Sequence, residues 1–144
     1  MAPLVVLVVV TGIARLAGIL DIAGWLDSWP HALRIGLAAM FLLTASAHFQ
    51  QPRRAGLIAM VPTGLPSAPA MVTLTGVLEV AGAVGLLIPP VAPIAAAALA
   101  ALLVVMFPAN VRAARADLGI TTMSLPVRAI VQVGFVAAAI VAAF

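Results

Sequence analysis

The sequence contains no cysteine. This absence excludes disulfides, thiol relays, iron–sulfur clusters and thiolate metal sites from the chemistry of the chain. Lysine is absent as well, so the seven basic side chains behind the net charge of +3 are all arginines. These arginines stand near the ends of apolar segments, as membrane topology requires, and they do not form a nucleic-acid patch.

Charge of either sign is scarce. Only 8% of the residues are charged and 65% are hydrophobic, whereas a soluble domain carries about 25% charged residues. So few charges cannot cover a surface that faces water. We therefore expect residues 1–144 to form a single integral membrane domain whose first partner is the lipid bilayer.

Five apolar segments are long enough to cross a bilayer as helices, because each residue of a helix adds ~1.5 Å. They cover residues 4–22, 32–49, 70–88, 93–111 and 125–144. This pattern predicts an all-α fold, a transmembrane helical bundle. Residues 50–69 are expected to form a surface or re-entrant loop with a short amphipathic helix from Arg53 to near Met60, because the prolines of VPTGLPSAP exclude a regular helix. Pro108 is expected to kink or end the fourth long helix.

The charges between the segments predict an orientation. The linkers that follow the second and fourth segments are rich in arginine, whereas the first linker carries Asp21 and Asp27. Arginine-rich linkers stay in the cytoplasm. We therefore expect the N-terminus in the cytoplasm and the C-terminus outside. The arginines concerned are Arg53, Arg54, Arg112 and Arg115, with Arg128 just beyond and Asp117 in the same fourth linker.

Four stretches in order, HFQQPRR, VPTGLP, LTGVLEVAGAVGLLIP and MFPANVRAA, resemble the DoxX-like family of small integral membrane proteins. The resemblance covers residues 33–144. It implies a four-helix DoxX-like core, to which residues 4–22 add one extra N-terminal transmembrane helix. It also implies a link to membrane redox complexes, to thiosulfate and quinone oxidation, or to the assembly of partner proteins, since relatives serve each of these roles.

One carboxylate, Glu79, lies near the middle of the third segment, where an acid costs roughly 2.5–3.5 kcal/mol on insertion scales. Helical side chains lean toward their own N-terminus, so in the expected topology five polar side chains aim at the inner half of the bundle. This predicts a candidate pocket of His48, Glu79, Asn110, Arg15 and Gln132. Arg15 is the first choice as the ionic partner of Glu79, and His48 is the second.

Each of these residues also has a purely structural interpretation. Glu79 could be a neutral acid that hydrogen-bonds a neighbouring helix, and His48 could simply end its helix at the interface. Asn110 could hydrogen-bond backbone carbonyl groups that lose their helical partner at Pro108. Arg53 and Arg54 could set topology only, or they could contact a lipid or quinone headgroup. No metal is expected, because the second histidine, His31, lies on the other side of the membrane.

The sequence leaves two functions open. The first is an accessory subunit of a quinone-linked membrane redox system, with a quinone as the candidate cofactor and another membrane or redox protein as the partner. The alternative is a non-catalytic bundle that assembles or stabilises a partner membrane protein. A small transporter ranks third, because no inverted repeat is apparent. Whether the chain is itself an enzyme, and its oligomeric state, are not determined by the sequence.

Overall fold

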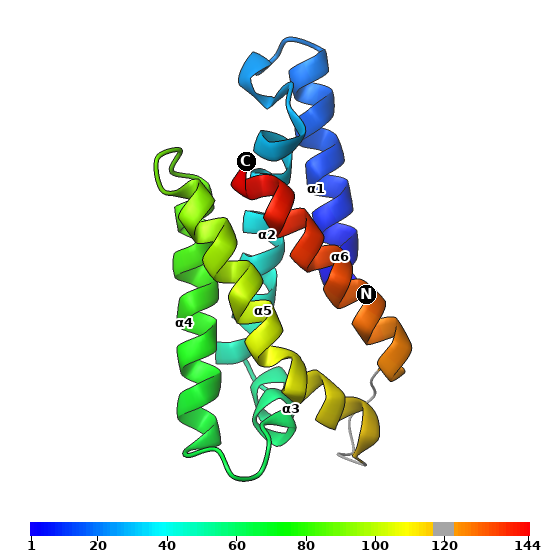
Figure 1. Cartoon of the computed structure of the whole chain (residues 1–144), viewed down its shortest axis with the longest axis vertical. Helices are drawn as coiled ribbons and strands as arrows, with labels where there is room; N and C mark the ends of the chain where they lie inside the picture. Colours follow the sequence, from blue (N-terminus) through cyan, green and yellow to red (C-terminus); the bar gives the residue numbers. More distant parts are fainter. Residues whose placement is uncertain (117–122) are drawn as a thin grey trace.

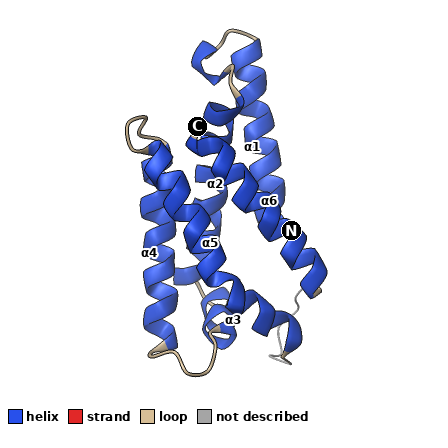
Figure 2. Cartoon of the chain, viewed as in Figure 1, coloured by secondary structure: helices blue, strands red, loops and turns tan. Residues whose placement is uncertain are grey.

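The computed structural model describes residues 1–116 and 123–144, and the regular elements in these residues are helices joined by loops (Figures 1 and 2). The helices are α1 (Ala2–Ile19), α2 (Trp29–Phe49), α3 (Arg53–Met60), α4 (Ala68–Leu86), α5 (Ala92–Arg115) and α6 (Leu125–Ala143), with a short 3₁₀ turn η1 (Gly24–Leu26). All except α3 and η1 are long and apolar enough to cross a membrane. The expectation of an all-α transmembrane bundle is confirmed, and the protein is a multi-pass membrane protein.

Four of the long helices form a ring. α2 packs against α4 and α6, and α5 packs against both α4 and α6. α1 packs chiefly against α2, on the outside of this ring (Figure 1). This is the arrangement expected from the sequence, a four-helix core with one added N-terminal helix.

The core depends on small side chains that let the helices approach closely. Along α4 the buried residues recur every three or four positions, which places them in one stripe facing α2 and α5. Lipid is as apolar as leucine, so such stripes associate through close packing more than through exclusion of water. The stripe consists of Val72, Gly76, Glu79, Ala83 and Leu86.

α1 crosses α2 at a glycine. A Cβ atom on Gly36 would collide with the Thr11 hydroxyl of α1 and would lie 2.9 Å from the carbonyl oxygen of Leu7. Only glycine lets the two backbones approach so closely. The crossing fixes how far α1 is shifted along α2, and α1 begins at about mid-height of the bundle (Figure 1).

The boundaries differ from the sequence prediction by a few residues. α2 begins at Trp29 instead of residue 32, because Ser28 caps it by accepting a hydrogen bond from the His31 backbone amide at 3.4 Å. α5 continues through Pro108 to Arg115 instead of ending near residue 111. Proline removes one backbone hydrogen bond, and the amides that follow can still find helical partners, so α5 bends without ending (Figure 1).

α3 matches the short amphipathic helix expected from Arg53 to Met60, and residues 61–67, which follow it, contain no helix. We call residues 61–67 the proline loop. Both segments lie at the end of the bundle where α2 ends and α4 begins (Figure 1). The expected linker position of Asp117 lies outside the described residues.

Candidate functional site

A cavity of about 610 Å³ lies beneath α3 and the proline loop. Its walls come from the last turn of α2, from α3, from the proline loop, from the first turns of α4 and from α5 around Pro108. Most of the lining is aliphatic or thioether, with Leu57, Leu65 and Met106 among the lining residues. The polar lining residues are His48, Thr63, Thr75 and Asn110. The site is therefore an apolar chamber with a few polar points, and the sequence had predicted a cluster of polar groups.

His48 is the most deeply buried of these polar points, with only 3% of its surface exposed. It packs against α4 at Gly76, where an added Cβ would lie 2.6 Å from the His48 Cβ. Its Nε2 faces Glu79 Oε1 at 3.9 Å, and its Nδ1 is buried without a hydrogen-bond partner among the described residues. A buried imidazole nitrogen without a partner is costly to the fold.

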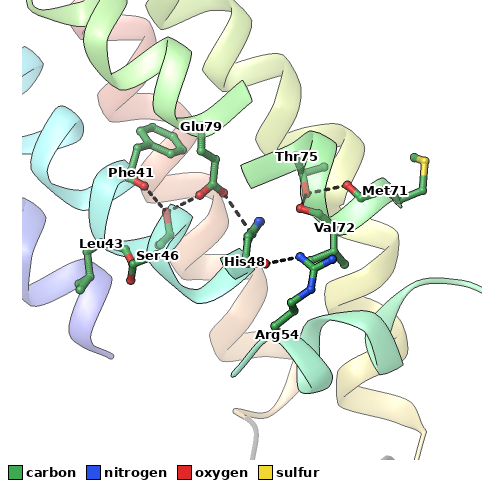
Figure 3. A network of polar contacts seen from close by, with 10 residues as sticks. Phe41, Leu43, Ser46, His48, Arg54, Met71, Val72, Thr75 and Glu79 are labelled. Atoms are coloured by element: carbon green, nitrogen blue, oxygen red, sulfur yellow. Dashed lines mark hydrogen bonds and ion pairs between the residues drawn. The ribbon is translucent and has the colours of Figure 1, made fainter. Parts of the chain in front are cut away.

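Glu79 lies beside His48 and is 4% exposed. Its carboxyl group points toward the His48 ring (Figure 3). Thr44, on the same face of α2 as His48, places its hydroxyl 2.8 Å from Glu79 Oε2. The Thr44 hydroxyl is also 3.1 Å from the carbonyl oxygen of Phe41. Among the described residues no arginine comes within 4.0 Å of Glu79, so the geometry is that of a hydrogen-bonded acid.

Arg54 joins three segments at the same end of the bundle. Its guanidinium donates to the carbonyl oxygen of His48, to that of Pro69 at 3.2 Å and to the Thr73 hydroxyl at 2.9 Å. These bonds hold the end of α2 to the start of α4. On the other side of α3, Arg112 Nε donates to the Ala59 carbonyl oxygen at 3.3 Å. Together the two arginines fix α3 over the cavity.

The headgroup contact of Arg53 and Arg54 stays a prediction. Arg53 is exposed and suits such a contact. Arg54 directs its donors at protein acceptors, so its first role is to hold the helix ends together.

The prediction that Arg15 pairs with Glu79 is wrong. Arg15 Nη1 lies 2.5 Å from Asp27 Oδ1 and 3.3 Å from the Leu26 carbonyl oxygen, and the guanidinium stands over the Trp29 ring at 5.2 Å. These contacts are at the opposite end of the bundle from α3. Arg15 therefore closes the turn between α1 and α2 and is not part of the cavity.

The reason is the shift of α1. Thr11 is level with Gly36, and Thr44 is level with Glu79. Arg15 lies four residues beyond Thr11 in one direction, and Thr44 lies eight residues beyond Gly36 in the other. These twelve residues separate Arg15 from Glu79 by about 18 Å along the bundle. The sequence prediction measured the depth of each residue by counting from the start of its helix. That count assumes that all helices start at the same height in the membrane, and α1 does not.

The remaining two predicted pocket residues lie between α5 and α6. Asn110 lines the cavity, and its Oδ1 accepts a hydrogen bond from Arg128 Nη1 at 2.6 Å. Gln132 Nε2 donates to the Leu103 carbonyl oxygen at 2.5 Å and does not line the cavity. Of the five predicted residues, His48 and Asn110 line the cavity, Glu79 lies beside His48 without lining it, and Arg15 and Gln132 lie outside the site.

The sequence reasoning did not foresee two contributors, the Thr44 hydroxyl beside Glu79 and the Arg54 guanidinium that holds the helix ends. A signal for Thr44 was present, because Thr44 and His48 are four residues apart and so share one face of α2. No comparable signal exists for Arg54, whose acceptors lie in distant segments. No group of three or more histidine, aspartate or glutamate side chains suited to a metal ion occurs in residues 1–116 and 123–144.

We predict that Arg54→Lys lowers stability, because an ammonium group cannot reach three acceptors in different directions. The expected loss is roughly 1.5–3 kcal/mol, the range for charged hydrogen bonds. The measurement is the thermal unfolding midpoint in detergent. Arg53→Lys is the matched control and should change the midpoint little, since Arg53 is exposed. Equal midpoints for the two variants would contradict the role given to Arg54.

Comparison with known proteins gives one family. A family model described as "Domain of unknown function (DUF8561)" matches residues 37–143, from within α2 almost to the end of α6. α1 lies outside this match, as it lies outside the four-helix ring. Neither the curated proteins nor the solved structures contain a match. Because the matched residues make up more than half of the chain, the protein belongs to the DUF8561 family, whose function is unknown.

Proposed function

We propose that the protein is an accessory subunit of a quinone-linked membrane redox system and that its cavity holds the ring of a lipid-soluble quinone. The observation that carries the proposal is the cavity itself, an apolar chamber of about 610 Å³ with His48 among its few polar lining residues. A quinone ring is flat and apolar with carbonyl groups at its edge. It would fill the chamber, with its carbonyl edge toward the polar lining residues.

The dimensions of the cavity support this proposal. Pockets for small molecules typically enclose ~300–1,000 Å³ and combine apolar walls with a few polar groups. The cavity has about 610 Å³ and this composition. The resemblance to DoxX-like proteins, which we also propose, points to the same redox setting. The absence of cysteine supports the accessory role, because the chain has no thiol with which to carry electrons itself.

We also propose that the cavity faces the cytoplasmic side, with the N-terminus in the cytoplasm and the C-terminus outside. Five arginines lie in or beside the connections at the α3 end of the bundle, and the opposite end combines two arginines with two aspartates. The positive-inside rule favours this orientation. The five are Arg53, Arg54, Arg112, Arg115 and Arg128.

Cysteine labelling tests the orientation, on a clean background because the chain has no cysteine. Thr63→Cys and Ser67→Cys in the proline loop should react with a membrane-impermeant maleimide only in inverted vesicles. The control is Ile22→Cys in the first turn, where Ile22 is 76% exposed. It should react only in right-side-out vesicles. The reverse pattern would refute the proposed topology.

A binding measurement tests the occupant. Radiolabelled decyl-benzoquinone is titrated against the protein in detergent. Ala109→Trp fills the cavity, because Ala109 is one of its lining residues, and the indole should exclude the ring and weaken binding by about tenfold or more, the equivalent of ~1.4 kcal/mol. Ala101→Trp places the same side chain at an exposed position of α5 and should bind like the unmodified protein.

A second filled variant guards against simple misfolding. Leu65→Trp fills the cavity from the proline loop without changing a helix. Both filled variants should keep the unfolding midpoint of the Ala101→Trp protein. Binding that is equal in all three variants would place the quinone elsewhere. No saturable binding in the unmodified protein would remove the redox proposal and favour the role in assembling a partner protein.

A further inference from the structure

α4 and α5 are antiparallel neighbours that the turn at residues 87–91 connects (Figure 1). The two helices are in close contact near this turn. A Cβ atom added to Gly85 would lie 2.8 Å from the Ala95 Cβ. A Cβ atom added to Gly82 would lie 2.5 Å from the Leu99 side chain. From the first contact to the second, each helix advances by three or four residues, so the helices keep one register along their interface.

The same register leads from this interface to the cavity. Thr75 lies seven residues before Gly82 on α4, and Val105 lies six residues after Leu99 on α5. Thr75 and Val105 are therefore at the same level, about 10 Å from the Gly82 contact. Both line the cavity. The two helices thus touch near their connecting turn and have the cavity between them at this level, where α5 runs away from α4 (Figure 1).

Val105 belongs both to the cavity wall and to the outer surface, because it lines the cavity and is 73% exposed. It lies near the middle of α5, a helix long and apolar enough to cross a membrane, so the medium outside it is the hydrocarbon layer. A residue with these two properties stands at the edge of an opening. α4 and α5 form the sides of this opening, because the described lining residues include none from α1 or α6.

The protein surface at the level of Val105 makes no demand for hydrogen bonds from the cavity. The Thr75 hydroxyl lies 3.0 Å from the Met71 carbonyl oxygen and 3.1 Å from that of Val72, so its proton is used within α4. His48 Nε2 faces Glu79, and His48 Nδ1 is buried. A hydrocarbon chain could therefore lie in the opening without leaving an exposed polar group unsatisfied.

We propose that the opening between α4 and α5 is a lateral portal to the bilayer, through which the ligand ring enters the cavity and in which the hydrocarbon tail of the bound ligand remains. The proposal rests on the proposed function and adds the ligand class, a ring that carries a long apolar tail. A cavity of about 610 Å³ is of the size that encloses a drug-sized molecule. An isoprenoid quinone is larger than this, so its tail needs an exit.

The proline loop is the other exposed border of the cavity, and it is a poor exit for a tail. Its lining residues Thr63 and Leu65 are exposed at the end of the bundle, beyond the start of α4. A tail that left there would bring its methylene groups among headgroups and water, which the hydrophobic effect opposes. Beside Val105 the tail passes directly into hydrocarbon.

Two probes with the same ring test the portal. One is decyl-benzoquinone, and the other carries a methyl group in place of the decyl tail. Val105→Trp places an indole at the edge of the opening. It should lower the ratio of decyl-probe affinity to methyl-probe affinity by about tenfold, because the indole obstructs the tail more than the ring. Partitioning of each probe into detergent is common to all variants and cancels when these ratios are compared.

Val104→Trp is the matched control. Val104 is the neighbouring valine of α5, is 59% exposed and is not among the lining residues. This variant should keep the affinity ratio of the unmodified protein. Retained binding of the methyl probe by Val105→Trp shows that this variant is folded.

Photolabelling of the unmodified protein tests the portal without any substitution. A decyl-benzoquinone with a diazirine at the end of its tail is bound to the protein in lipid vesicles and irradiated. Peptide mass spectrometry should find the label on the facing parts of α4 and α5, and an excess of decyl-benzoquinone should suppress it. Suppressible label on the proline loop or α3 would overturn the proposal.

The binding outcomes separate the portal from the proposed function. An unchanged affinity ratio in Val105→Trp, or an equal fall in Val104→Trp, refutes the portal and leaves the ring site in place. A Val105→Trp protein that loses both probes equally also refutes it, because the side chain then acts on the ring alone. If neither probe binds the unmodified protein, the proposed function fails and the portal fails with it.

Discussion

The structure depends on how a carboxyl group is accommodated inside an apolar helix. Glu79 is on the packed stripe of α4 and cannot reach water. The compensation comes from α2, whose Thr44 and His48 present a hydroxyl and an imidazole to the two carboxyl oxygens. For these groups to meet, α2 and α4 must lie in close contact, and Gly76 makes room for the His48 side chain. Two features therefore set the contact between α2 and α4: the carboxyl group of Glu79 requires polar partners, and Gly76 has no side chain to keep the helices apart.

The cavity is a consequence of the same contact. Once α2 ends beside Gly76, the chain has to return to α4 through α3 and the proline loop, which spread over the end of the bundle. Arg54 holds this cover to α2 and α4, and Arg112 holds it to α5. α5 lines the space beneath the cover around Pro108, the proline inside that helix. From the core toward the end of the bundle, Glu79 comes first, His48 second and the apolar chamber last.

Much of this fold could be predicted from the sequence because its signals are local. Apolar length identifies the five long helices, and the prolines after Met60 identify the break between α3 and α4. The pairing of Arg15 with Glu79 could not be judged in this way. Depth in the membrane follows from residue counts only if helices start at the same level, and the Gly36 crossing shifts α1. The cavity could not be predicted from the sequence either. It depends on where α3 docks, and the acceptors of Arg54 set that docking position.

The central claim is that a lipid-soluble quinone occupies the chamber beside His48. Its most direct test is organic extraction and mass spectrometry of the protein purified from its native membrane in mild detergent, with a second multi-pass membrane protein purified in parallel. The account predicts an isoprenoid quinone in near-equimolar amount with the unmodified protein and its depletion from a His48→Leu variant of unchanged yield. Quinone at the level of the parallel protein, or undiminished in His48→Leu, would contradict it.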